Sequence, residues 1–273
     1  ATVNSKSSPT SVIIKAAVHG RSSISTQSDT LTVTTGVATQ LGFDLSASKY
    51  NLDSDLSGDS SILTVRIVDA NGNPVADGVP VVAVTNFGSV GTSGRGGCTT
   101  VNGACTVEYR VQNPRPTDGT PVSVVFSTQT GQGTQISDTL PLWVNSVNEL
   151  GLYTPPTPPA ALASPTTELT LKVNDAATCK FDSVNLLLGT PAGFAAPAGT
   201  TIAVRSLNGI STPTITDGSP TLDRAAIRTG FIISASGKLG SAGGGDDQWI
   251  FTFTAGPSKT VRSVQLPVKV PRC

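Results

Sequence analysis

Residues 62–84 read ILTVRIVDANGNPVADGVPVVAV and carry the clearest structural signal in the chain. Apolar Leu63, Val65 and Ile67 alternate with polar neighbours, which is the period of a strand buried on one face. The run DANGNP at 69–74 combines Asx side chains, a glycine able to adopt a positive φ and a proline, so it predicts a turn. Alternating apolar residues resume after it. The stretch therefore predicts two strands joined by a turn.

A second turn signal lies downstream, in the stretch CTTVNGACTVEYRV at residues 98–111. The Asn-Gly pair at 102–103 favours a tight hairpin turn. Apolar residues alternate after it: Val107, Tyr109, Val111. Further Val- and Leu-rich runs at 122–126 and 140–144 complete a series of short strands separated by turn residues. Such a series is typical of an all-β sandwich.

This order of strand, DANGNP turn and NG hairpin resembles a bacterial immunoglobulin-like domain of the intimin/invasin (Big-1) type. The resemblance covers residues 36–147, which is about two fifths of the chain. It implies a surface-exposed antiparallel sandwich, often present in tandem, that serves as a rigid stalk or adhesin segment and has no catalytic residues. The pair Cys98 and Cys105 departs from the pattern of the family's spacer modules and argues against a purely spacing role.

The rest of the chain predicts tandem immunoglobulin-like sandwiches. The segment QSDTLTV at 27–33 is similar to QISDTLPL at 135–142, and a similar strand precedes each. We therefore expect residues 1–35 to be partial or terminal strands of a preceding immunoglobulin-like module; the alternative is a chance likeness between Ser/Thr-rich strands. Clustered prolines predict a semi-rigid linker over 148–166. Alternating apolar residues predict a further β-sandwich module over 167–273.

The four cysteines form one close and one distant pair in the sequence: Cys98, Cys105, Cys179, Cys273. Three disulfide connectivities are possible, and the simplest places one bridge in each module. A metal site is disfavoured because no C-x-x-C spacing occurs and His19 is the single histidine. Disulfides indicate an oxidising compartment, which means the cell surface, the medium or the periplasm.

Composition excludes several classes of partner. Eighteen basic residues balance eighteen acidic ones, and no Lys/Arg cluster occurs, so we expect no nucleic-acid binding. No run approaches the length of about 18 apolar residues that a membrane-spanning helix needs. The sequence contains no Met, so we expect that it does not begin at its own translation start and that a signal segment was removed or not included. The partial repeat at its start predicts neighbouring modules of a longer polypeptide.

The densest acidic cluster contains Asp53, Asp55 and Asp59. This D-x-D-x-x-x-D spacing can supply three carboxylates and nearby carbonyls, which are the ligands that Ca²⁺ prefers. The alternative is a solvated loop between strands. The pair Asp246 and Asp247, after three glycines, is a weaker metal candidate. Beyond a structural Ca²⁺ the sequence predicts no cofactor.

The aromatic residues of the C-terminal module are few and lie close together. Trp249, Phe251 and Phe253 share one face of an expected strand, which is typical of a core. The alternative is a platform on which Trp249 binds a sugar or a protein. Trp143, near the end of its own strand, is expected in a core or at a contact between modules.

The sequence lacks the usual signs of catalysis. Nucleophilic catalysis needs an activated Ser or Cys beside a base, but His19 stands alone and no G-x-S-x-G motif occurs. We therefore expect a protein that is not an enzyme. A secreted hydrolase using only carboxylates is the remaining catalytic alternative.

These observations predict a non-catalytic bacterial surface or secreted protein whose modules mediate attachment or structural spacing. The alternative is a glycan-binding accessory module of a secreted enzyme or surface complex. The expected partner is a protein or a glycan at a surface. The Gly-rich loop at 89–97, beside Cys98, is the first candidate for recognition because loops at the ends of sandwiches are free to vary.

Overall fold

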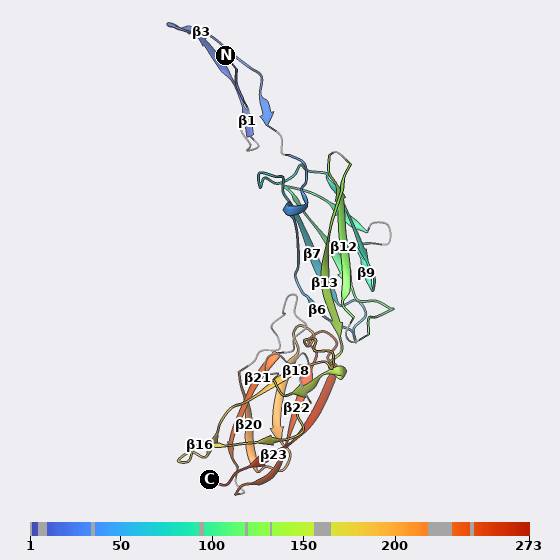
Figure 1. Ribbon diagram of the computed structural model, residues 1–273, viewed down its shortest axis with the longest axis vertical. Helices are drawn as coiled ribbons and strands as arrows, with labels where there is room; N and C mark the ends of the chain where they lie inside the picture. Colours follow the sequence, from blue (N-terminus) through green and yellow to red (C-terminus); the bar gives the residue numbers. More distant parts are fainter. Residues whose placement is uncertain are drawn as a thin grey trace.

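The computed structural model describes residues 2–4, 10–33, 36–92, 96–117, 120–131, 133–155, 165–217, 231–240 and 243–273. These residues form two β-sandwiches arranged end to end, with a β-hairpin beyond the first sandwich (Figure 1). Within these ranges the helical elements are two short 3-10 helices, η1 (Gln40–Gly42) and η2 (Val147–Glu149). The expectation of an all-β chain of tandem immunoglobulin-like sandwiches is confirmed.

The first sandwich packs a four-stranded sheet against a five-stranded sheet, with one core between them. The four-stranded sheet has the order β5 (Phe43–Ala47), β7 (Ser60–Ile67), β11 (Ala104–Arg110), β9 (Ser89–Val90). The five-stranded sheet has the order β10 (Gly97–Thr99), β8 (Pro80–Thr85), β12 (Val122–Gln129), β13 (Gln135–Asn145), β6 (Asn51–Asp53). Only the β13–β6 pair of these two sheets is parallel.

The alternation read from the sequence sets the inner faces of this sandwich. Leu63, Val65 and Ile67 of β7 are fully buried, as expected. The facing sheet contributes fully buried residues of β12: Val122, Val124, Phe126. Because successive side chains of a strand point to opposite faces, the residues between them face solvent.

The DANGNP turn forms as expected and carries the chain from one sheet to the other. The Asp69 carboxylate accepts hydrogen bonds from the backbone N–H groups of Asn71 at 2.8 Å and Asn73 at 2.9 Å. Gly72 has a φ of 80°, which a side-chain-bearing residue adopts only at a cost. The turn leads from β7 in the four-stranded sheet to β8 in the five-stranded sheet, so it links the two layers.

The second sandwich also has two layers around one core. One sheet has the order β14 (Gly151–Tyr153), β18 (Val184–Gly189), β21 (Phe231–Leu239), β17 (Lys180–Phe181), β16 (Val173–Asp175), with β20 (Ser211–Asp217) also paired to β21. The other has the order β15 (Leu169–Thr170), β23 (Val261–Val270), β22 (Gly245–Thr254), β19 (Thr201–Ser206).

The first residues of the expected linker over 148–166 are folded, contrary to the prediction. Val147, Leu150 and Leu152 are buried in the core of the second sandwich, and β14 pairs with β18. These residues therefore belong to the second sandwich, because burying their apolar side chains there is more favourable than exposing them in a spacer. The proline-rich run at 156–164 lies outside the described residues.

The N-terminal hairpin consists of four short strands. These are β1 (Thr10–Val12), β2 (Lys15–Val18), β3 (Arg21–Gln27) and β4 (Leu31–Val33), paired as β1–β4 and β2–β3. All their described side chains are exposed. An isolated two-stranded hairpin is only marginally stable in water. We therefore expect this hairpin to gain stability when further strands pack against it.

The register of this hairpin repeats that of the last hairpin of the first sandwich. Val12 is opposite Leu31, as Val124 is opposite Leu140, and both pairs have the same position relative to the SDTL motif. Val12 and Leu31 are 37% and 44% exposed, whereas Val124 and Leu140 are 0% and 5% exposed. The hairpin thus has the pairing of a sandwich's closing hairpin without a facing sheet among the described residues. The assignment of residues 1–35 to a preceding module stays a prediction.

Candidate functional site

The acidic loop after β6 lies where the two sandwiches meet. Asp53 ends β6 and is fully buried. One oxygen of its carboxylate accepts the backbone N–H of Ser258, in the second sandwich, at 3.0 Å. The other oxygen accepts the backbone N–H of Asp55 at 3.0 Å. A carboxylate of the first sandwich therefore binds the backbone of the second.

The two remaining acidic side chains of this loop also have protein partners. The Asp55 carboxylate accepts a hydrogen bond from the Ser146 hydroxyl at 2.6 Å. Asp59 forms an ion pair with Lys49 and accepts the backbone N–H of Asp53 at 2.8 Å. Over the described ranges, no group of three or more His, Cys, Asp and Glu side chains is placed to hold a metal ion. Calcium binding by Asp53, Asp55 and Asp59 stays a prediction of the sequence.

Other contacts extend this junction across the boundary. The side-chain amide of Asn145 donates to the Ala195 carbonyl at 3.1 Å, and the Ala198 N–H donates to the Asn51 carbonyl at 2.9 Å. Trp143 meets Phe194 edge to face, with ring centroids 6.3 Å apart. Trp143 is 4% exposed and Phe194 is 1% exposed. The expectation that Trp143 contacts the neighbouring module agrees with this geometry.

The chain has regular structure on both sides of the junction and within it. β13 ends at Asn145, and Ser146 begins η2 with a capping box in which Glu149 takes part. Hydrogen bonds between buried groups are strong in a low-dielectric surrounding and costly to break. The two sandwiches are thus joined by a structured segment and by hydrogen bonds across their boundary.

The Cys98–Cys105 disulfide joins the two sheets of the first sandwich. Across a simple hairpin the two cysteines would face each other as a cross-strand pair, which is the arrangement that the short loop suggests. Instead Cys98 is paired with Val81 of β8, and Cys105 with Val65 of β7. The turn at 101–104 forms, but the strands on either side of it enter different sheets. The bridge thus closes the open edge of the sandwich.

A shallow groove with a volume of 520 Å³ lies along this edge, over the disulfide. Its walls include Thr99, Val101 and Thr106. The expected recognition loop at 89–97 begins with β9 and ends in β10, and residues 93–95 lie outside the described part of the chain. Recognition by this loop stays a prediction.

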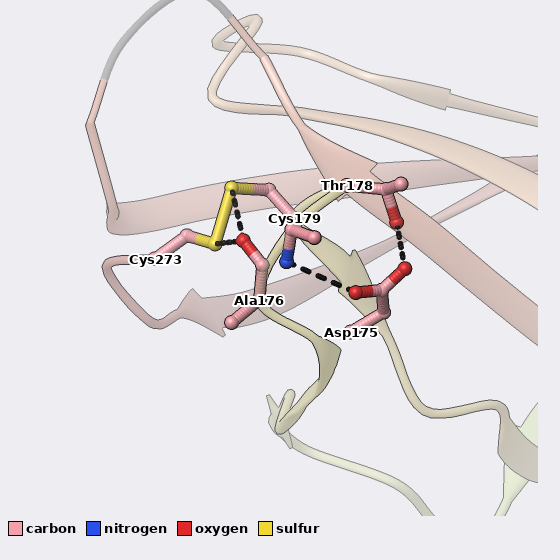
Figure 2. The surroundings of a disulfide bond; sticks show 6 residues. Asp175, Ala176, Thr178, Cys179 and Cys273 are labelled. Carbon is pink, nitrogen blue, oxygen red and sulfur yellow. Dashed lines mark hydrogen bonds between the residues drawn. A yellow bond between two sulfur atoms is a disulfide. The ribbon is translucent and has the colours of Figure 1, made fainter.

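Figure 2 shows the Cys179–Cys273 disulfide. Its Cys273 lies at the C-terminus, at the end of the second sandwich away from the first (Figure 1). Both sulfur atoms approach the carbonyl oxygen of Ala176, at 3.7 and 3.2 Å. The Asp175 carboxylate fixes the same turn, because it accepts a hydrogen bond from the Thr178 hydroxyl at 2.5 Å. That hydrogen bond also lowers the pKa of Asp175. The bridge thus anchors the end of the chain to a turn that already has its own hydrogen bonds.

Trp249 does not form a binding platform. Its side chain is fully buried, and its indole N–H donates to the Ser211 hydroxyl at 2.8 Å. The alternative in which Trp249 binds a sugar is therefore wrong, because neither face of the ring is open to solvent. The core interpretation of the stripe with Phe251 and Phe253 is correct, since both are also fully buried.

Asp247 is the polar centre of this part of the core. Its carboxylate accepts hydrogen bonds from the hydroxyls of Ser211 at 2.6 Å and Ser206 at 2.8 Å. Burial raises the pKa of Asp247, but these hydroxyls and the N–H groups of Gln248 and Asn208 lower it more, so the pKa lies below its ordinary value. Asp247 is thus satisfied by protein donors. No local sequence pattern shows this network, because Ser206 and Ser211 lie about 40 positions from Asp247.

Asp69 should make the stability of the first sandwich dependent on pH. Hydrogen bonds from the N–H groups of Asn73, Gly36 and Asn71 lower its pKa from 3.8 to about 2. Because the folded state has the lower pKa, its stabilising effect is complete above about pH 4 and is lost as the pH falls towards 2. Replacing Asp69 by Asn should weaken this acid dependence, measured as the shift in urea midpoint between pH 5 and pH 2.5. An unchanged shift would contradict the role given to Asp69.

The single histidine and the helical elements bear on the expectations about catalysis and membrane spans. His19 is exposed at the turn between β2 and β3. The hairpin that contains β3 lies beyond the first sandwich (Figure 1). A secreted hydrolase would need a base elsewhere. Of the helical elements in the described part, none has the length and apolar character needed to cross a bilayer.

Comparison with known proteins gives structural likenesses only. No protein family and no curated protein matches the sequence. The chain is similar to a C-terminal 282-residue fragment of intimin, solved with the intimin-binding domain of its translocated receptor, at 11% identity over 86% of this chain and 64% of that one (TM-score 0.31). It is similar to InvD of Yersinia pseudotuberculosis at 15% identity over 85% of this chain and 58% of that one (TM-score 0.33).

A third structure, the D0–D1 domain of intimin, is 14% identical over 85% of this chain and 99% of that one (TM-score 0.31). The chain spans about three fifths of the length of the first two matched proteins. No argument about function follows from likenesses at this level.

Proposed function

We propose that this chain is a stalk and adhesin segment of a bacterial surface protein, located outside the cytoplasm and without catalytic activity. The observation that carries the proposal is the buried junction, in which Asp53, Asn145 and Trp143 of the first sandwich contact the second. A joint of this kind makes two modules act as one rod. The two disulfides and the motif resemblance to intimin/invasin-type modules support the same function.

The mechanism follows from how such a rod carries load. Pulling on the ends of the first sandwich shears the long antiparallel pair β12–β13, whose hydrogen bonds lie across the pulling direction. In the second sandwich, β22 and β23 lie between Cys179 and Cys273, so the disulfide carries the load past them. A stiff joint keeps the far end at a fixed distance from the cell surface. Loops and grooves at the module ends and faces are then free to bind a protein or glycan partner.

Removing the Asp53 carboxylate should loosen the rod. In Asp53→Ala the N–H of the half-buried Ser258 loses its acceptor, which costs up to about 1–3 kcal/mol at the junction. Small-angle X-ray scattering should give a single elongated shape for the wild type and a broader distribution of distances for the variant. Asp44→Ala, which removes an exposed carboxylate from β5, is the matched control and should behave as the wild type.

The adhesive function can be tested with the same variants on coated beads. Wild-type beads should bind cells, or a protein or glycan array, saturably. Beads carrying Asp53→Ala should bind as well at rest but detach sooner under flow. Absence of saturable binding to every such surface, or equal scattering curves for Asp53→Ala and the wild type, would contradict the proposal.

A further inference from the structure

A polar groove with a volume of 440 Å³ opens on the six-stranded side of the second sandwich. Six of the residues that line it carry ammonium or hydroxyl groups: Lys180, Ser183, Thr212, Thr214, Ser236, Lys238. They come from β17, β20, β21 and the turn after β17, so the groove lies on the face of this sheet.

The strand register brings the two lysines together. Lys180 of β17 is directly opposite Lys238 of β21, and Lys238 is opposite Thr212 of β20. The next row pairs Ser236 with Thr214. Residues two apart on a strand share a face, so both rows point to the same side of the sheet. The sheet thus presents two adjacent ammonium groups bordered by hydroxyls.

Two like charges directly opposite each other destabilise a sheet. Within the described ranges, neither lysine lies within salt-bridge distance of a carboxylate. Asp175 interacts electrostatically with Lys180, but its oxygens already accept hydrogen bonds from Thr178 and Ala177. The arrangement is unfavourable for the free protein and becomes favourable when an anion lies between the two ammonium groups.

The backbone positions of the two lysines are also fixed in advance. The Cys179–Cys273 disulfide precedes Lys180 directly, and the Cys179 carbonyl accepts the N–H of Leu239, next to Lys238, at 3.0 Å. A disulfide and a backbone hydrogen bond therefore hold the two strands together at the groove. A site that is ordered before binding loses less entropy when its ligand arrives.

We propose that this groove binds an acidic polysaccharide, with a sulfate or uronate group between Lys180 and Lys238. Hydroxyls both donate and accept hydrogen bonds, so Thr212, Thr214 and Ser236 suit sugar hydroxyls. An extended acidic peptide is disfavoured because the groove lies on strands already paired within the sheet, whereas peptides add to free sheet edges. This inference does not rest on the stalk function.

The test compares binding of heparin fragments, hyaluronan and neutral dextran to the 273-residue chain by calorimetry. The wild type should bind at least one acidic polymer and not dextran, with an affinity that falls as salt rises. Lys180→Glu and Lys238→Glu should each weaken binding at least tenfold, whereas Lys180→Arg should retain it. Lys269→Glu, on the opposite sheet, is the matched control and should bind as the wild type.

The melting temperature of each variant distinguishes loss of the binding site from loss of the fold. Lys180→Glu places opposite charges across the register, so its melting temperature should equal or exceed that of the wild type. Weakened binding with a raised or unchanged melting temperature supports the site. Equal weakening by Lys269→Glu, binding of poly-glutamate as tight as that of heparin, or no binding to any acidic polysaccharide would overturn it.

Discussion

Replacing Trp249 by Ala is expected to lower the free energy of unfolding of the second sandwich by about 3–5 kcal/mol, because a large side chain is removed from a close-packed core. Trp249 is the largest fully buried side chain of the chain, and its ring lies 6.3 Å from that of Phe251. Its indole N–H donates to the Ser211 hydroxyl, which in turn donates to the Asp247 carboxylate. The substitution therefore leaves both a cavity and a weakened polar network.

Urea unfolding of the wild type and the variant measures this loss, with the transition of the second sandwich identified by hydrogen exchange in β22. Trp249→Phe is the control, because it keeps most of the ring volume and removes the N–H, and it should cost less than Trp249→Ala. A Trp249→Ala protein that unfolds like the wild type but has lost binding to a sugar would contradict the core assignment.

The first sandwich could be predicted from sequence where local chemistry determines the structure. Leu63, Val65 and Ile67 are two positions apart, and only a strand, with its period of two, places all three on one buried face. The turn at 69–74 forms because Asp69 binds the N–H groups that follow it and Gly72 adopts a positive φ. Each of these features depends on residues within a few positions of one another.

The disulfide geometry of the first sandwich could not be predicted in this way. The turn at 101–104 is the same whether its two strands pair with each other or enter separate sheets. The choice is made by Val65 and Val81, the distant residues with which Cys105 and Cys98 pair. The Asn-Gly pair therefore predicts the turn but not the two separate sheets in which Cys98 and Cys105 lie.

The predicted linker begins too early in the chain, because its bounds rest on the clustered prolines alone. The segment before them contains Ser-Val-Asn-Glu at 146–149, the spacing of a helix capping box, and the structure forms that box. Apolar residues recur directly after Ser146, at Val147, Leu150 and Leu152, and all three are buried. A capping box followed by apolar residues predicts a short folded helix at this position instead of a linker.

The junction and the lysine groove depend on contacts between residues far apart in the sequence. Asp53 and Ser258 are separated by 205 positions, so the sequence showed a cluster of carboxylates without the N–H group that one of them binds. Lys180 and Lys238 are likewise brought together only by the pairing of β17 with β21. Such sites need the tertiary structure because no local pattern contains both partners.

Replacing both Cys179 and Cys273 by Ser is expected to destabilise the second sandwich by about 2–5 kcal/mol. The two residues are 94 positions apart, so the bridge closes most of the module into one loop and removes many conformations from the unfolded chain. In the chain-entropy treatment, a loop of this length corresponds to about 4.7 kcal/mol. The measurement is urea unfolding of the double variant and of the wild type under non-reducing conditions.

The other disulfide provides the matched control, because Cys98 and Cys105 are only 7 positions apart. The same treatment gives about 2.5 kcal/mol for so short a loop, so the double serine variant at 98 and 105 should lose less stability, and lose it from the first sandwich. Reducing agent added to the wild type should reproduce both losses together. A larger loss from the short loop than from the long one would show that the bridges act by local packing at their sheets and not by restricting the unfolded chain.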